Sequence, residues 1–292
     1  LSERRQSKTT TPSDHLLMKP VLSYLYLIIG FYTLIATLLF VFQRSFLYLP
    51  DKTTPDAAAA AQAFSIKPIT LTTADGLSLR SWWYASQNAH SRSVIIILHG
   101  NAGHAGYRFS KFASMMEAGF NVLFLEYRGY GGNPGKPTES GLKQDTTAAI
   151  HYLRDHGFPA SQVALYGESL GCGLAIDQAS NKRFAAVVLE APYTSIADVA
   201  QDHYWFLPAG WLTRDRFESL SKIHQIDAPL LILHGNKDQV INPKHGHRMF
   251  AAASEPKAAI FVPGAGHNDL YDSNVDTKVI EFLKHHGKFS AD

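Results

Sequence analysis

The sequence predicts an α/β protein with an open, mostly parallel central sheet, helices on both faces and one apolar helix before it. From Phe64 onward, short apolar runs alternate with helix-like stretches, which is typical of repeated strand–helix units. Ahead of them, residues 21–42 form an uncharged stretch of 22 residues. Residues 191–224 interrupt the alternation, and we expect them to form a short lid over the sheet edge.

Composition bounds the function only broadly. With 292 residues, 46% of them hydrophobic, the chain can bury one large core or two small ones. The formal charge of +2 is too small to indicate nucleic-acid binding. The single cysteine, Cys172, excludes an internal disulfide, and we interpret it as a small core residue.

The uncharged stretch from Val21 to Phe42 follows a polar tail, residues 1–20. As a helix it is long enough to span the ~30 Å hydrocarbon core of a bilayer. Tyr24 and Tyr26 suit an interfacial belt, and no small-residue cleavage site follows directly. We therefore expect an uncleaved transmembrane anchor. A cleaved signal peptide and a helix buried on the main domain are the alternatives.

The basic residues around this stretch predict its orientation. Four precede it, whereas Arg44 and Lys52 follow it closely. This bias favours a cytoplasmic N-terminus, with the larger part of the chain on the periplasmic, lumenal or extracellular side. Residues 43–63 form a connector, with Phe46 and Tyr48 expected at the membrane surface or on the domain and a possible short helix at 57–61.

The main domain, residues 64–292, opens with a predicted hairpin. Runs from Ile66 to Thr73 and from Leu77 to Tyr84 flank Ala74-Asp75-Gly76, a turn sequence. Six further strands are expected at Val94–Leu98, Val122–Leu125, Val163–Tyr166, Ala185–Leu189, Leu230–Leu233 and Ala259–Val262. Helices are expected at His104–Ala118, from Thr138 to Arg154, after Ser169, at Pro243–Ala252 and at Asn274–His285.

The sequence Gly167-Glu168-Ser169-Leu170-Gly171 lies between a short apolar strand and a helix rich in small residues. That context is the one a nucleophile elbow requires, because the serine sits on a strained turn and the glycines let strand and helix approach closely. We expect Ser169 to be a nucleophile. The alternative is a close-packed turn with an incidental serine.

A serine nucleophile needs a base and an orienting acid. His267 follows the last predicted strand within Gly264-Ala265-Gly266-His267, and we expect it to be the general base. Asp238 closes another strand and lies between Ser169 and His267 in the chain, the order serine, acid, histidine. It is the expected acid, with Asp227 and Asp269 as alternatives.

The oxyanion of an acyl-transfer intermediate needs N–H donors. The turn His99-Gly100-Asn101-Ala102-Gly103 follows a buried strand and can offer the N–H of Asn101, or alternatively of Ala102, beside the N–H of Leu170. His99 is expected to shape this loop rather than act as a base. An ordinary glycine turn is the alternative interpretation.

These fragments together resemble the α/β-hydrolase superfamily over residues 66 to about 283. The HGNAG and YRGYG sequences at 99–103 and 127–131 look like the membrane-associated abhydrolase-domain proteins, whose animal members include protein depalmitoylases. The resemblance implies serine esterase, lipase or thioesterase chemistry on an acyl ester, thioester or lipid substrate, without metal or cofactor. Asn133 stands where many relatives carry serine, in a loop expected to shape the pocket.

Aromatic residues are candidates for the substrate pocket. Tyr127 lies in the YRGYG loop, and Tyr204, Trp205 and Phe206 lie in the lid. The lid aromatics could contact an acyl chain, reach the membrane surface, or simply pack the lid onto the sheet. A metal site at His245 and His247 lacks a clear set of further ligands.

The sequence therefore predicts a membrane-anchored serine hydrolase with the triad Ser169, Asp238 and His267. A peptidase is the alternative enzyme, because the same triad can cleave amides. A non-catalytic scaffold that keeps the fold for binding is the alternative of another class.

Overall fold

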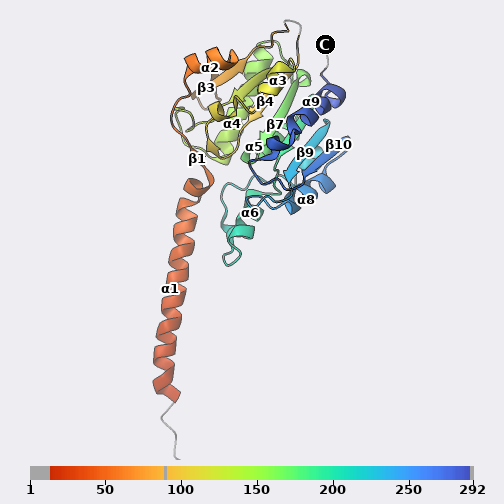
Figure 1. The fold of residues 1–292 in the computed structure, drawn as a ribbon. Coiled ribbons are helices and arrows are strands. Elements are labelled where there is room, and N and C mark those ends of the chain that lie inside the picture. The colour runs from red at the N-terminus through yellow and green to blue at the C-terminus, as the bar shows by residue number, and fades with distance from the viewer. Residues whose placement is uncertain (1–13, 89–90, 290–292) are drawn as a thin grey trace, which may run out of the picture. The chain divides into compact units, whose positions relative to one another are not determined.

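The computed structural model describes residues 14–88 and 91–289, and the chain divides into two compact units at the bond between Gln43 and Arg44 (Figure 1). Most of the predicted polar tail, residues 1–13, lies outside the described residues.

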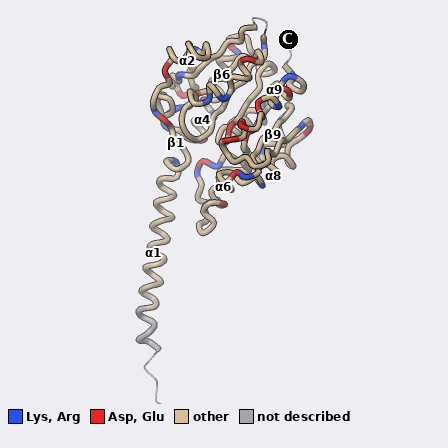
Figure 2. Tube along the Cα trace, viewed as in Figure 1, with Lys and Arg blue, Asp and Glu red and all other residues tan. Residues whose placement is uncertain are grey.

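The first unit consists of most of helix α1 (Asp14–Leu47). Within it, Val21–Leu47 has a mean hydropathy of 2.4, and by length and composition it can cross a membrane. No charged residue occurs from Val21 up to Arg44, and Figure 2 shows these turns of the helix without charge. The helix continues past Phe42 because none of residues 43–47 is a proline or glycine, and it ends before Tyr48, which is buried.

The second unit contains an eight-stranded sheet in the order β10-β9-β8-β7-β4-β6-β3-β2. Only the β2–β3 and β3–β6 pairs are antiparallel, so the predicted open, mostly parallel sheet is confirmed. The strands are β2 (Lys67–Thr72), β3 (Ser78–Tyr84), β4 (Val94–Leu98), β6 (Asn121–Leu125), β7 (Val163–Glu168), β8 (Ala186–Glu190), β9 (Leu230–Gly235) and β10 (Lys257–Val262).

Helices cover both faces of this sheet (Figure 1). Strand β4 is apolar throughout, and its alternate side chains belong to two separate hydrophobic clusters. The cluster with Ile96 includes residues of α4 (Glu139–Asp155), α5 (Leu170–Ala179) and α8 (Lys244–Ala252). The cluster with Ile97 includes residues of α2 (Ala57–Phe64), α3 (Ala113–Glu117) and α9 (Val275–His286).

The stretch predicted as one helix from His104 to Ala118 is broken. Within this range the structure has the 3-10 helix η1 (Ala105–Arg108) and the short α3, and the strand β5 (Ala102–Gly103) lies directly before it. Strand β5 pairs in parallel with β1 (Leu49–Pro50), a contact between segments far apart in the sequence. The pairing ends at Gly103, directly before the predicted helix, and the chain forms η1 and then α3 where one continuous helix was expected. The other 3-10 helices are η2 (Ala160–Gln162), η3 (Ile223–Gln225) and η4 (Leu270–Ser273).

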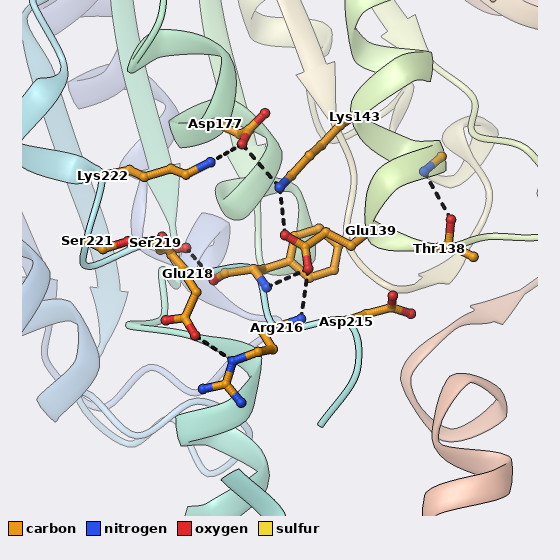
Figure 3. A network of polar contacts seen from close by, with 12 residues as sticks. Thr138, Glu139, Lys143, Asp177, Asp215, Arg216, Glu218, Ser219, Ser221 and Lys222 are labelled. Atoms are coloured by element: carbon orange, nitrogen blue, oxygen red, sulfur yellow. Dashed lines mark hydrogen bonds and ion pairs between the residues drawn. The ribbon is translucent and has the colours of Figure 1, made fainter. Parts of the chain in front are cut away.

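Residues 191–224, which we call the cap, follow β8 and contain α6 (Ile196–His203) and α7 (Ala209–Leu212). Glu139 of α4 accepts hydrogen bonds from the backbone N–H groups of Arg216 (2.8 Å) and Phe217 (3.0 Å). Figure 3 shows this contact, with Lys143 placed between Glu139 and Asp177. The returning arm of the cap is thus fixed to the body of the second unit.

Candidate active site

Ser169 lies on the sharp turn between β7 and α5, and its φ of 51° is in the left-handed region. That conformation costs energy for a residue with a side chain, and the turn persists because its surroundings leave no alternative. A Cβ on Gly171 would lie 2.0 Å from the carbonyl oxygen of Leu98, and one on Gly167 would lie 2.7 Å from the Cα of Cys172. Glycine at both positions lets the turn pack this tightly.

The three residues predicted as a triad lie together at the carboxyl edge of the sheet. The Nε2 atom of His267 lies 3.1 Å from the Oγ of Ser169, and its Nδ1 lies 2.7 Å from Oδ2 of Asp238. These three side chains come from the ends of three different strands, β7, β9 and β10. Ser169 and His267 are within reach for proton transfer, and Asp238 is placed to orient the imidazole.

The second oxygen of the Asp238 carboxylate is held by the backbone. Its Oδ1 accepts hydrogen bonds of 2.8 Å from the N–H groups of Val240 and Ile241. Burial raises the pKa of Asp238, but hydrogen bonding with His234 and His267 outweighs burial and holds that pKa well below its usual range. Asp238 is therefore an anion at neutral pH, as the orienting role requires.

The alternative acids and the histidine pair considered for a metal have other contacts. Asp227 lies 3.9 Å from Arg183, and Oδ1 of Asp269 accepts a hydrogen bond from the N–H of Gly266. His245 contacts Thr194 and Asp202, whereas the ring of His247 stacks on Phe261. Within residues 14–88 and 91–289, no group of three or more His, Cys, Asp and Glu side chains is placed to hold a metal ion.

The loop predicted to supply oxyanion donors lies against the nucleophile. A Cβ on Gly100 would lie 3.5 Å from the Cβ of Ser169. The side chain of Asn101 donates to the carbonyl of Leu47, and the carbonyl of Asn101 accepts from Tyr130 and Leu49, so the loop is fixed from several sides. The other predicted donor, the N–H of Leu170, is at the first residue of α5, where the helix dipole favours negative charge.

His99 lies inside this loop, as a buried residue. Its ring packs on that of Tyr127 at a centroid distance of 4.2 Å, and its Nε2 lies 3.3 Å from the carboxylate of Glu126. Tyr127 in turn donates from its hydroxyl to the carbonyl of His99. These contacts give His99 and Tyr127 a role in shaping the loop behind the nucleophile.

A partly buried network of charged side chains beside Ser169 was not predicted from the sequence. Glu168 forms ion pairs with Arg108 (2.6 Å) and Lys111 (3.0 Å), and Lys111 also pairs with Glu190 (2.8 Å). Tyr166 donates a 2.6 Å hydrogen bond to Glu190. The signal available in the sequence was Glu168 itself, because a carboxylate within a buried strand–helix turn needs a cation.

These ion pairs keep the Glu168 carboxylate and the Lys111 ammonium group charged. Burial raises the pKa of Glu168, but Lys111 and Arg108 outweigh it and hold that pKa well below its usual range. Burial likewise lowers the pKa of Lys111, and the carboxylates of Glu190 and Glu168 more than compensate, so that this pKa is raised. The residue preceding the nucleophile is thus fixed by charge-assisted hydrogen bonds.

A cavity of about 180 Å³ lies beside Ser169. Its lining is mostly polar: Tyr107, Arg108, Lys111, Glu168, Ser169, Glu190, Ala191, His267 and Asn268. None of the aromatic residues expected in the substrate pocket lines it. Tyr127 is fully buried, and Tyr204, Trp205 and Phe206 are exposed on the cap. Asn133, expected in a pocket-shaping loop, hydrogen-bonds the backbone of Arg80 in β3.

Comparison with known proteins agrees with this fold. The family model described as "Serine aminopeptidase, S33" matches residues 89–221. Uncharacterized protein Rv2307c of Mycobacterium tuberculosis is 36% identical over 240 residues, 80% of this chain and 84% of the relative. Human alpha/beta hydrolase domain-containing protein 17B is 35% identical over 187 residues, 62% of each chain.

Solved structures show the same fold. The Pyrococcus furiosus esterase Pf2001 superposes with a TM-score of 0.67, at 20% sequence identity, over 82% of this chain and 99% of the esterase. Together with the sequence relatives, this likeness defines the class: the chain belongs to the α/β-hydrolase superfamily. Within that superfamily it is related to the abhydrolase-domain proteins, so the resemblance read from the sequence is confirmed.

Proposed function

We propose that this protein is a membrane-anchored serine hydrolase that cleaves acyl ester or thioester bonds. The observation that carries the proposal is the chain of contacts from Ser169 through His267 to Asp238, at 3.1 and 2.7 Å. A structural neighbour, Pf2001 of Pyrococcus furiosus, is an esterase, which supports the same reaction class.

The chemistry follows from these contacts. The Oγ of Ser169 attacks the acyl carbonyl while Nε2 of His267 takes its proton, and Asp238 stabilises the imidazolium that forms. The oxyanion of the tetrahedral intermediate lies at the N-terminus of α5, beside the loop with Asn101. The intermediate then expels the alcohol or thiol, which receives the proton from His267. Water then attacks the acyl-enzyme while His267 takes its proton. The second tetrahedral intermediate expels the Oγ of Ser169, which receives that proton, and the carboxylic acid is released.

The polar cavity indicates which part of the substrate lies at the nucleophile. Its lining includes two cations, Arg108 and Lys111, and two anions, Glu168 and Glu190. Transfer of an acyl chain into such a lining would strip water from charged groups without replacing it. We therefore assign the cavity to the polar leaving-group end of the substrate, and the apolar anchor and cap favour a lipid-like acyl part.

The first experiment measures hydrolysis of p-nitrophenyl esters from acetate to palmitate. Wild type is expected to be active, and Ser169→Ala is expected to lose at least about three orders of magnitude in kcat. Ser221→Ala is the matched control, because Ser221 is an exposed residue whose hydroxyl only donates to the carbonyl of Glu218. Equal activity in wild type and Ser169→Ala would refute the proposal.

A peptidase is the second candidate, because the family model that matches residues 89–221 is that of a serine aminopeptidase. Cleavage of aminoacyl amides without hydrolysis of any ester would identify the protein as a peptidase. Labelling by a fluorophosphonate probe separates both enzymes from a scaffold, because a folded wild type that resists the probe would have no activated serine.

Membrane anchoring through residues 21–42, with a cytoplasmic N-terminus, is part of the proposal. Its support is the uncharged helix and the basic residues ahead of it. Carbonate extraction of membranes tests the anchor, and intact mass of the extracted protein distinguishes an anchor from a cleaved signal peptide. Protease protection in sealed vesicles then reports on which side the hydrolase domain lies.

A further inference from the structure

We propose that the tip of the cap, residues 204–213, is a membrane-binding surface whose aromatic side chains enter the interfacial region of the lipid bilayer. The proposal rests on the membrane anchoring given under the proposed function. It assigns the exposed aromatic side chains of the cap to the bilayer rather than to the substrate cavity, which they do not line.

The tip presents large apolar side chains to solvent. Trp205 is 79% exposed, Trp211 82% and Phe206 50%. No Lys, Arg, Asp or Glu occurs in these ten residues, and Figure 2 shows the tip beyond α6 without charge. Exposed aromatic residues gathered on one uncharged loop mark an interaction surface. Tryptophan in particular is enriched where a protein meets the interface of a membrane.

The tip is held in this conformation by its own contacts. Leu207 is buried and fixes the middle of the segment. Gln201 of α6 donates to the carbonyl of Leu207 at 2.9 Å and accepts from the N–H of Gly210 at 3.1 Å. The guanidinium of Arg216 donates to the carbonyl of Gly210. The aromatic side chains therefore project from a loop whose backbone is already fixed, so little backbone entropy is lost when the tip binds.

Chain connectivity identifies the bilayer as the partner. Arg44 stands two residues after the apolar stretch ends at Phe42, about 7 Å of extended backbone at most. Its guanidinium forms a bidentate ion pair with Asp215, with distances of 2.8 and 3.0 Å. Asp215 in turn stands two residues after the tip ends. Once residues 21–42 span a membrane, this pair holds the base of the tip close to the membrane surface.

A second exposed aromatic side chain lies close to Arg44 in the sequence. Phe46, two residues after Arg44, is 58% exposed, whereas Tyr48 that follows is buried. The ion pair thus joins two short segments that each present aromatic surface, and a charged pair of this kind suits the polar headgroup level. A second protein would not need this connection to the end of the apolar stretch, which is why the bilayer is the occupant we infer.

The tryptophans of the chain allow a direct test. There are four, and the two outside the cap, Trp82 and Trp83, lie in β3, where Trp82 is fully buried and Trp83 packs on Phe158. The full chain is reconstituted into phosphatidylcholine vesicles with or without bromine on the acyl chains near the headgroup. We expect brominated lipid to quench a large part of the tryptophan fluorescence of wild type.

The variant Trp205→Phe/Trp211→Phe keeps aromatic side chains at both positions and leaves only Trp82 and Trp83 as fluorophores. We expect it to lose most of the quenching by brominated lipid. Quenching of the same extent in the variant, or no quenching in wild type, would overturn the proposal. Flotation of the vesicles is measured in parallel. Protein that floats without quenching contradicts only the cap surface, whereas protein that does not float contradicts the anchor itself.

Discussion

The hydroxyl of Tyr271 donates a 2.9 Å hydrogen bond to the hydroxyl of Tyr166, which in turn donates to Glu190. Tyr271 follows His267 by four residues, and Tyr166 precedes Ser169 by three. The bond therefore joins the segment that follows His267 to the strand that leads to Ser169. Through Glu190 and Lys111 it also reaches Glu168, so one polar network connects the surroundings of Ser169 and His267.

This relationship predicts the effect of Tyr271→Phe. The substitution removes one hydrogen bond, worth about 1 kcal/mol, and leaves the Tyr166–Glu190 bond in place. We expect Tm to fall by about 2–4 °C and the fluorophosphonate labelling rate of Ser169 to fall severalfold, because the His267 loop loses its link to β7. Tyr152→Phe, on α4, is the control. Unchanged labelling in Tyr271→Phe would mean that this link does not position the base.

Asp238→Asn tests the orientation of the imidazole. The amide oxygen of asparagine can still accept from Val240 and Ile241, so the loop is retained. Its NH₂ group then faces Nδ1 of His267 and favours the wrong tautomer, and we expect kcat on esters to fall by about 10⁴. Tm should fall as well, because a carboxylate whose pKa is lowered in the folded state stabilises the fold at neutral pH, so the rate is measured well below the Tm of the variant.

The matched control for this substitution is Asp269→Asn, because Asp269 accepts only through Oδ1 from the N–H of Gly266, a bond that an amide oxygen preserves. Ester hydrolysis at the wild-type rate is expected there. Activity of Asp238→Asn equal to that of Asp269→Asn would remove Asp238 from the mechanism and leave the imidazole without its acid.

The lowered pKa of Glu168 predicts how stability depends on pH. A carboxylate whose pKa is lower in the folded state stabilises the fold above its unfolded pKa of about 4.3, and that contribution is lost as pH falls through the folded pKa. Wild type should therefore lose Tm steadily below pH ~4.3. Glu168→Gln should have a lower Tm at pH 7 and a flatter decline in acid.

Thermal unfolding followed by circular dichroism from pH 7 to pH 3 checks this expectation. The control is Glu218→Gln, which breaks an exposed pair with Arg216 and should change Tm by about a degree or less, as surface pairs generally contribute little. Parallel Tm–pH curves for wild type and Glu168→Gln would show that this carboxylate does not gain its stabilisation from Lys111 and Arg108.

The sequence predicted the sheet and the three residues that meet at its edge because both depend on local order along the chain. Val94–Leu98 is apolar at every position, which marks a strand buried on both faces. Ser169, Asp238 and His267 each follow a strand, and parallel strands bring their carboxyl ends to one edge. Proximity of the three therefore follows from topology, without knowledge of any side-chain contact.

What the sequence did not predict depends on pairings between distant segments. Arg108 and Lys111 were placed in one continuous helix, whereas the chain forms the 3-10 turn η1 at Ala105–Arg108 and both side chains pair with Glu168, about 60 residues further along the chain. Periodicity cannot detect such a pairing. Likewise, aromatic character alone could not distinguish a buried loop residue such as Tyr127 from an exposed one such as Trp205, because tyrosine and tryptophan both occur in substrate pockets.

Tight packing at the nucleophile turn predicts opposite outcomes for two glycines. A Cβ on Gly171 would lie 2.0 Å from the backbone oxygen of Leu98 and 3.1 Å from that of His99. No flexible side chain can move away, so Gly171→Ala must displace α5 from β4 and distort the Ser169 turn. We expect a loss of several kcal/mol in the free energy of unfolding, seen as little soluble protein or a Tm lowered by more than about 6 °C.

The control is Gly210→Ala, in α7, where the added Cβ meets no atom closer than 3.5 Å and the helix gains propensity of up to about 1 kcal/mol. It should match or exceed wild type in Tm, and a Gly171→Ala protein as stable as Gly210→Ala would contradict the close approach of α5 to β4 on which the position of Ser169 depends.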